Sequence, residues 1–265
     1  MKRRAKQGCC RASRALVHLS VLIPVAALTI VGTPTSASAA SASFASQSAR
    51  SIISEARHAM TMEGSVSATG EGPVSIPGLD NAVVSETNYT GSKSGRQLLN
   101  TTSGSGGQAS ATTLDVAGNL YVNASVSFWS KSVGLTDPQA SIVAGKWVQI
   151  PSSSPIYMPA IADLTMSSLT RDMFAAKKYH KGKIQKVDGV RVIKITYTNG
   201  GVDSGPATCY VAVGGRHLPV SITIGGLALS LRSWGKKVTI DAPQGAVPLS
   251  SLLLPSTPPG TGVVA

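Results

Sequence analysis

The stretch that decides the fold is residues 218–232, LPVSITIGGLALSLR. Its larger apolar side chains recur at alternate positions on either side of the central glycines, and they are Leu218, Val220, Ile222, Ile224, Leu227, Leu229 and Leu231. Side chains of a β-strand point alternately to opposite faces, so this spacing predicts strands with one apolar and one polar face. Val238 and Ile240 continue the pattern. An apolar face of this length must be covered by other parts of the chain.

Other segments predict that these strands belong to a meandering antiparallel sheet. Asp188-Gly189 supplies the positive φ angles of a type I′ turn, and it joins predicted strands at 183–187 and 190–198. Upstream, valine, threonine and serine alternate with turn residues at short intervals, which predicts further short strands. These strands are residues 64–69, 82–90, 96–103, 108–116, 119–123 and 146–150.

Two segments have helical spacing. Ile52, Ile53 and Ala56 share one face of a helix over residues 46–62, which begins near Ser48 or Ser51. A second helical region covers residues 156–176. Both regions are available to cover the apolar face, so the predicted fold class is α+β.

The N-terminus has the layout of a secretory signal. Six basic residues within the first 14 precede the largely apolar residues 15–31, and Ala37-Ser38-Ala39 forms an A-x-A cleavage site. The predicted organisation is therefore a signal at 1–39, a linker at 40–45, a folded domain at 46–254 and a Pro/Gly tail at 255–265. An uncleaved anchor helix is the alternative, but Pro24 and a length below the ~20 residues of a spanning helix favour cleavage.

Cysteine positions bear on localisation. Cys9 and Cys10 precede the apolar run, so no cysteine stands where a lipoprotein would be acylated. We expect an exported protein that is secreted, or associated with the cell envelope through an uncleaved signal. Cys209 lies in an apolar segment, which predicts a small buried hydrophobic residue rather than a nucleophile.

Composition excludes several classes of protein. The 265-residue chain has 24 basic and 12 acidic residues, a net charge of +12, yet only 14% of its residues are charged. A disordered nucleic-acid-binding tail would be far more charge-dense, and collagen, coiled coils and disulfide scaffolds have other compositions. Six of the basic residues belong to the signal, which leaves a modestly basic domain. We expect no nucleic-acid partner for an exported chain, and we expect a monomer.

An ordered set of short motifs resembles a known family. The motifs are GNLYVN at 118–123, GKWVQI at 145–150, the Asp188-Gly189 hairpin, YVA at 210–212 before LPV at 218–220, and SWG at 233–235 before VTIDAP at 238–243. Together they resemble the LppX/LprG family of actinobacterial cell-envelope lipoproteins, within the LolA-like half-barrel superfamily. The resemblance spans about residues 46–254.

The resemblance implies a curved antiparallel sheet, or half-barrel, with helices packed over its concave apolar face to form a cavity for acyl chains. The residues expected to line this cavity are Val83, Leu120, Val122, Trp129, Val148, Leu164, Ile193, Ile195, Val220, Ile222, Leu229 and Leu231. One departure from the family is that Ala39-Ala40-Ser41 replaces the lipidated cysteine after the signal. Alternation by itself would equally indicate an ordinary packed core.

Motifs for catalysis are not found. The sequence has no G-x-S-x-G, H-E-x-x-H, C-x-x-C or calcium-loop motif, and the S-x-x-K string at 233–236 lacks its S-D-N and K-T-G partners. Gly104 to Gly107 lack the spacing of a phosphate-binding loop. We therefore expect no enzyme activity, no catalytic residue, no cofactor and no metal site.

A lysine cluster is the densest charge feature of the predicted mature chain. It consists of Lys177, Lys178, Lys181, Lys183 and Lys186. The functional interpretation is a docking patch for anionic membrane headgroups or cell-wall polymers. The other interpretation is that these lysines only form the solvent-exposed face of a loop and hairpin.

Two functions follow from these observations. The first is an exported, non-enzymatic carrier or binding protein for lipid or acylated ligands of the cell envelope. The second is a secreted structural or regulatory envelope module that binds another protein and has a filled core.

Overall fold

The structure is a computed structural model, and it describes residues 42–76, 79–103, 107–154, 164–200 and 205–253. Three predicted features lie outside the described residues. They are the signal at 1–39, the tail at 255–265 and residues 156–163 of the second helical region.

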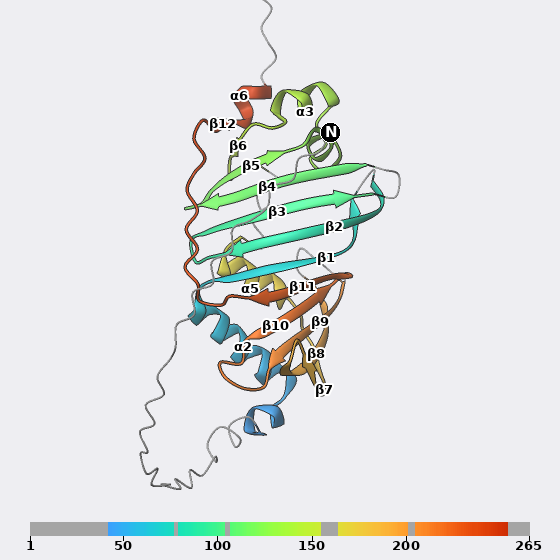
Figure 1. Ribbon diagram of the computed structural model, residues 1–265, viewed down its shortest axis with the longest axis vertical. Coiled ribbons are helices and arrows are strands. Elements are labelled where there is room, and N and C mark those ends of the chain that lie inside the picture. The colour runs from blue at the N-terminus through green and yellow to red at the C-terminus, as the bar shows by residue number, and fades with distance from the viewer. Residues whose placement is uncertain (1–41, 77–78, 104–106, 155–163, 201–204, 254–265) are drawn as a thin grey trace, which may run out of the picture. The chain divides into compact units, whose positions relative to one another are not determined.

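The described residues form one twelve-stranded sheet (Figure 1), in the order β12-β6-β5-β4-β3-β2-β1-β11-β10-β9-β8-β7. The strands are β1 (Val66–Ile76), β2 (Leu79–Thr90), β3 (Ser94–Thr102), β4 (Gln108–Val116), β5 (Asn119–Ala124), β6 (Val148–Ile150), β7 (Tyr179–Val187), β8 (Val190–Asn199), β9 (Gly205–Ala212), β10 (Pro219–Ile224), β11 (Leu227–Arg232) and β12 (Val247–Pro248). All neighbours pair antiparallel except β12 and β6, which pair parallel. With helices on its apolar face, the curved sheet confirms the predicted α+β class.

Most predicted strands are confirmed, and two details of the C-terminal half are wrong. β4 has the predicted bounds, and Asp188 and Gly189 have φ angles of 49° and 79°, as a type I′ turn requires. Val238 and Ile240 lie outside any strand. In β10 the register shifts between Pro219 and Ser221, so the regular alternation predicted from residue 218 begins only after this irregularity.

Glycines allow β1 and β11 to approach closely. A Cβ atom at Gly70 would lie 1.8 Å from the carbonyl oxygen of Ala228, and one at Gly72 would lie 2.6 Å from the Cα atom of Leu227. Glycine is the residue without a Cβ atom, so it fits where backbones come this close. These two residues let the N-terminal strands and the C-terminal strands join in a single sheet.

Helical elements accompany the sheet (Figure 1), and in the described part of the chain they include α2 (Ala49–Glu63), η1 (Phe128–Ser132), α3 (Asp137–Val143), α5 (Met166–Met173) and α6 (Leu249–Leu253). α2 begins after Ser48 because its hydroxyl accepts a hydrogen bond from the N–H of Ser51, at 3.1 Å. It ends at Gly64, where φ is +69°. α5 begins after Thr165, whose hydroxyl accepts from the N–H of Ser168.

The predicted linker at 40–45 contains a core residue. Residues 42–46 are helical, and Phe44 is only 1% exposed. Its ring stacks on His217 with a 3.6 Å separation between ring centroids. The packed region therefore begins before the predicted boundary at residue 46, because a single buried phenylalanine gives no periodic signal in sequence.

Gly95 controls how closely the start of α5 approaches the sheet. A Cβ atom there would lie 1.8 Å from the carbonyl oxygen of Leu164. We expect Gly95→Ala to lower the free energy of unfolding by about 1–3 kcal/mol, because the added methyl group would displace this backbone. Urea unfolding followed by circular dichroism measures the change.

The matched control is Gly182→Ala, another strand glycine. Its Cβ atom would first meet side-chain and backbone atoms of Lys194 at 3.2 Å, which calls for only a small adjustment. We expect a change of about 0.5 kcal/mol or less. Equal effects of the two substitutions would contradict the close contact between β3 and Leu164.

Candidate functional site

The pairing register aligns the side chains of the inner face, the face against which the helices pack, in rows across the sheet. One row runs from β8 to β5 through Ile195, Cys209, Ile222, Leu229, Gly70, Glu86, Leu99, Ala111 and Ala124. The next row runs from β11 to β6 through Leu231, Ala68, Asn88, Gln97, Thr113, Val122 and Val148. In both rows, polar or small residues separate two apolar ends.

Large apolar side chains form two separate clusters, one at each end of these rows. The first cluster packs β8 to β11 and β1 against α2 and α5, and it contains five predicted lining residues: Ile193, Ile195, Ile222, Leu229 and Leu231. The second cluster packs β4 to β6 against η1 and α3, and it contains the other five that are buried: Leu120, Val122, Trp129, Val148 and Leu164. These ten residues, which were predicted to line a single cavity, therefore lie in two separate apolar clusters.

Two predicted lining residues belong to neither cluster. Val83 is 46% exposed and lies on the outer face, opposite its buried neighbours Ala82 and Val84. Val220 is half-buried at the register shift in β10. Their positions correct the expectation that all twelve residues share one apolar surface.

Small residues occupy the inner face between the two clusters. We call Gly70, Gly72, Ala82, Val84 and Ala109 the central floor. Gly72, Val84 and Ala109 lie in one row with Thr101, and all but Gly70 are buried. This part of the face therefore contributes little side-chain volume of its own.

Beside the central floor lies a polar belt, which consists of Glu86, Asn88, Gln97, Thr113 and Asp115. The amide nitrogen of Gln97 donates to Oε1 of Glu86 at 3.0 Å, and that of Asn88 donates to the same oxygen. The side-chain oxygen of Asn88 is buried and accepts no hydrogen bond. Sequence analysis missed this belt, because polar residues within strands are normally expected on the solvent face.

Asp115 is the buried carboxyl at the end of this belt nearest the β4–β5 turn. It is 3% exposed, and the backbone N–H of Gly118 donates to its Oδ1 at 3.2 Å. Burial raises the pKa of Asp115, and the hydrogen bond from Gly118 opposes that shift only in part. The inner face can therefore present carboxyl and amide groups as well as apolar ones.

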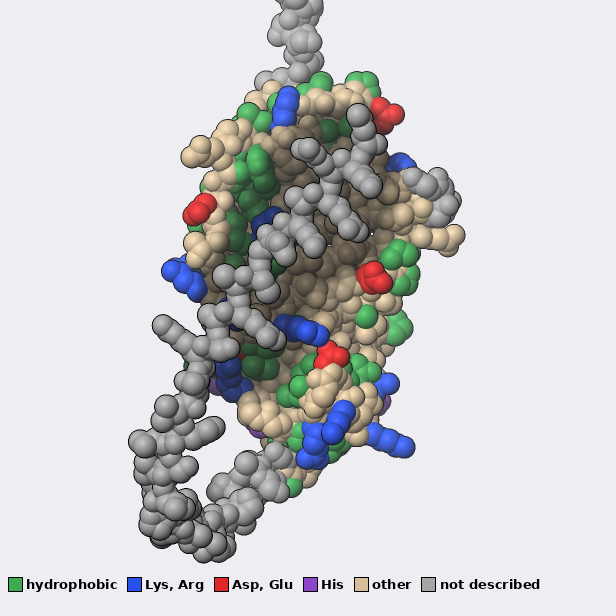
Figure 2. All heavy atoms as spheres, viewed as in Figure 1, with side chains coloured by type: hydrophobic (Ala, Val, Ile, Leu, Met, Phe, Trp, Pro, Cys, Tyr) green, Lys and Arg blue, Asp and Glu red, His purple; other side chains and the backbone are tan. Residues whose placement is uncertain are grey.

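The predicted lysine patch is divided by the structure. Lys177 and Lys178 join His180, Thr196 and Thr198 in lining a hollow of about 690 Å³ at the β7–β8 edge, which we call the basic hollow. Lys181 donates instead to the backbone oxygens of Ala45 and Gln47, at 3.3 and 2.7 Å. Lys183 and Lys186 are exposed on β7 and do not line this hollow. Figure 2 shows basic side chains gathered at this end of the molecule.

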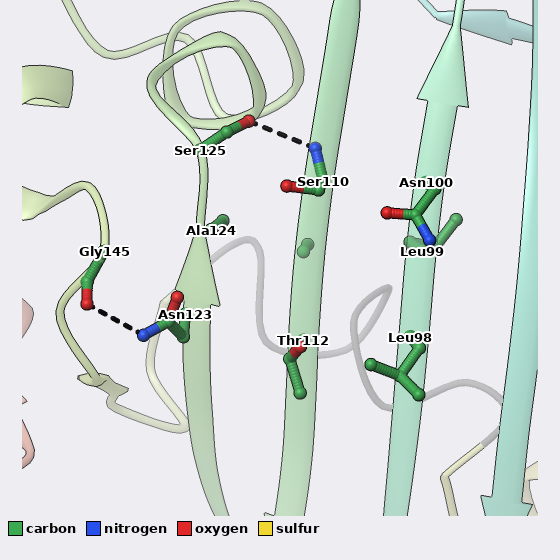
Figure 3. A pocket seen from close by; sticks show the side chains of 10 residues that line it. Leu98, Leu99, Asn100, Ser110, Thr112, Asn123, Ala124, Ser125 and Gly145 are labelled. Atoms are coloured by element: carbon green, nitrogen blue, oxygen red, sulfur yellow. Dashed lines mark hydrogen bonds between the residues drawn. The ribbon is translucent and has the colours of Figure 1, made fainter. Parts of the chain in front are cut away.

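Two further hollows lie elsewhere. One of about 410 Å³ lies over β3, β4 and β5, where Leu98, Thr112 and Asn123 form a row on the outer face (Figure 3). The other, of about 390 Å³, lies between α2 and α5, and we call it the arginine hollow. Its lining consists of Arg57, Thr61, Gly64, Ser92, Met166, Ser167, Thr170 and Arg171.

Within the described ranges, no group of three or more His, Cys, Asp and Glu side chains is placed to hold a metal ion. No helix in the part of the chain that the structure describes has the length and apolar character needed to cross a membrane.

Comparisons with known proteins gave matches among solved structures, whereas no family model and no curated protein matches the chain. The chain is similar to LprF from Mycobacterium bovis, with a TM-score of 0.46 and 15% identity over 74% of this chain and 96% of that one. It is similar to the lipoprotein LppX from Mycobacterium tuberculosis, with a TM-score of 0.44 and 17% identity over 73% of this chain and 100% of that one. The chain is also similar to a LolA superfamily protein from Nitrosomonas europaea, with a TM-score of 0.30 and 12% identity over 73% of this chain and 96% of that one.

Cys209 has the buried position that the sequence predicts. It is 0% exposed, and burial raises the pKa of its thiol to about 12. An unfolded thiol ionises near pH 8.5, so between that pH and about 12 the unfolded state loses a proton that the native state keeps. We expect the free energy of unfolding to fall across this range by up to about 1.4 kcal/mol per pH unit on account of Cys209.

The measurement is chemical denaturation between pH 8 and pH 10 of the wild type and of Cys209→Ala. Because other groups titrate in this range, the result is the difference between the two slopes. A steeper fall for the wild type is expected. Identical slopes would contradict the elevated thiol pKa.

Proposed function

We propose that the protein is an exported, non-enzymatic carrier or binding protein for lipid or acyl-chain ligands of the cell envelope. The observation that carries this proposal is the central floor, where small residues separate two clusters of large apolar side chains. A filled core of normal density would place large side chains throughout such a face. In this proposal an acyl chain lies over the central floor, between the two apolar clusters.

The polar belt indicates the chemical class of the ligand. Burying a carboxylate or an amide without full hydrogen bonding costs free energy, and the side-chain oxygen of Asn88 accepts no hydrogen bond. A ligand with a hydroxyl-bearing head could donate to Asn88 while its acyl chain lies on the central floor. We therefore propose an amphiphile rather than a plain hydrocarbon.

The second candidate is an envelope module that binds another protein and has a filled core. Its support comes from the clusters themselves, since Ile222 and Trp129 are fully buried and closely surrounded by apolar side chains. The two candidates differ in what fills the space above the central floor, so a substitution there separates them.

Val84→Trp tests the proposal directly. Val84 lies on the central floor, so we expect the indole to occupy ligand space and to reduce co-purified lipid at least about fivefold, with little loss of stability. Native mass spectrometry and solvent extraction of protein from an actinobacterial host measure the lipid. Ser85→Trp is the matched control, because the next residue along β2 is exposed on the opposite face.

Three outcomes are informative. Lipid on the wild type and on Ser85→Trp, but not on Val84→Trp, supports the carrier. Wild-type protein without lipid contradicts it. A loss of about 1–3 kcal/mol in stability for Val84→Trp, with no lipid on any variant, identifies the filled core of the second candidate.

We further propose that Lys177 and Lys178 dock the protein to anionic headgroups. Both lysines are exposed and line the basic hollow, whereas the ammonium group of Lys181 donates hydrogen bonds to backbone carbonyl oxygens. A lysine near an anionic surface contributes about 1 kcal/mol to binding, or about fivefold in affinity. The local geometry thus favours two of the five lysines in the predicted patch.

The matching test uses two double variants with the same change in charge. We expect Lys177→Gln with Lys178→Gln to weaken binding to vesicles containing phosphatidylglycerol by about 25-fold, measured by co-sedimentation in low salt. Lys183→Gln with Lys186→Gln should have a clearly smaller effect. Equal losses would show that net charge, not the basic hollow, determines docking.

A further inference from the structure

The arginine hollow combines a guanidinium pair with hydroxyl groups. Arg57 comes from α2 and Arg171 from α5, and Thr61, Ser92, Ser167 and Thr170 complete its polar lining. Planar guanidinium groups match the geometry of phosphate oxygens, and hydroxyl groups can donate to the oxygens that remain. The side chains that meet here therefore suit a tetrahedral oxyanion.

Thr170 provides an independent observation. The residue is 7% exposed, and its hydroxyl oxygen is buried without a hydrogen-bond partner. A threonine within a helix can satisfy its hydroxyl at the carbonyl oxygen four residues earlier, but Thr170 forms no such bond. Because Thr170 also lines the arginine hollow, a bound anion could accept a hydrogen bond from it.

The two arginines have different surroundings. Nε and Nη2 of Arg171 donate to Asp172 at 2.8 and 3.0 Å, which fixes the guanidinium group and leaves Nη1 for a ligand. Arg57 has no carboxylate partner among the residues that the structure describes. After the charge of Asp172 is counted, one positive charge remains to balance an anion.

Neighbouring groups already have other partners. Thr61 donates to the carbonyl oxygen of Arg57 at 3.0 Å, and Glu63 forms an ion pair with Arg216. Both carboxylates of α2 are thus held by other side chains, since Oε1 of Glu55 contacts Nδ1 of His217 at 2.7 Å. Neither carboxylate forms an ion pair with Arg57.

We propose that the arginine hollow binds a phosphate group, with Arg57, Arg171 and Thr170 as the residues that contact its oxygens. The phosphate can belong to the headgroup of a lipid or to a free phosphate ion, since both present the same oxygens. The site does not depend on the lipid-carrier function, because a protein with a filled core would contain the same hollow between α2 and α5.

The experiment titrates the full chain with inorganic phosphate and, separately, with the water-soluble lipid dihexanoyl phosphatidic acid, by isothermal titration calorimetry at constant ionic strength. We expect saturable binding to the wild type. Arg57→Gln should weaken it by about tenfold or more, because a charge-assisted hydrogen bond is lost. Thr170→Val, which keeps the shape of the side chain, should weaken it about threefold to tenfold.

Arg50→Gln is the matched control. Arg50 is also exposed on α2, but it does not line the arginine hollow, so we expect affinity within about twofold of the wild type. Circular dichroism confirms that each variant is folded, and Thr170→Val keeps the test decisive if Arg57→Gln unfolds. No saturable binding of either probe, or equal losses for Arg50→Gln and Arg57→Gln, would overturn the proposal.

The two probes also identify the source of the phosphate. Tighter binding of the lipid than of the inorganic ion, with both weakened by Arg57→Gln, assigns the site to a lipid headgroup. Binding of the inorganic ion alone assigns it to free phosphate. Either result supports the site, and neither depends on whether acyl chains occupy the central floor.

Discussion

The pairing of β1 with β11 is the contact on which the rest of the structure depends. It joins residues more than 150 positions apart in the chain, with Gly70 opposite Leu229 and Glu71 opposite Ala228. Without it, β1 to β6 with β12 would form one smaller sheet and β7 to β11 another, and β1 and β11 would each become an exposed edge. With it, the inner-face rows continue from β8 to β5, and one surface is shared by helices from both halves of the chain.

The same pairing explains why β1 carries glycine at the centre of the inner face. Gly70 and Gly72 are needed because a Cβ atom at either position would overlap the backbone of β11. Residues that must be glycine cannot contribute side chains to a core, so large apolar residues gather on either side instead. The close approach of β1 and β11 and the lack of large side chains on β1 thus have one physical origin.

The sequence predicted local geometry well and the assignment of faces less well. The bounds of β4, the turn at Asp188-Gly189 and the alternation of Leu227, Leu229 and Leu231 all follow from short-range rules. Val83 could not be placed, because in the run Ala82-Val83-Val84 all three residues are apolar and the period of two disappears. A register shift displaced Val220, and another between Lys181 and Ile184 interrupts the lysine-bearing strand. The polar belt depends on partners in other strands, which no local pattern records.

α5 is the element that connects the apolar and cationic features. Met166, Leu169 and Met173 pack into the first cluster, while Thr170 and Arg171 line the arginine hollow. At the end of α5, the carbonyl oxygen of Met173 accepts from the Tyr197 hydroxyl at 2.5 Å, and Tyr197 also lines the basic hollow. An anion bound in the arginine hollow would contact α2 and α5 together, so it would stabilise the arrangement in which α5 covers the first cluster.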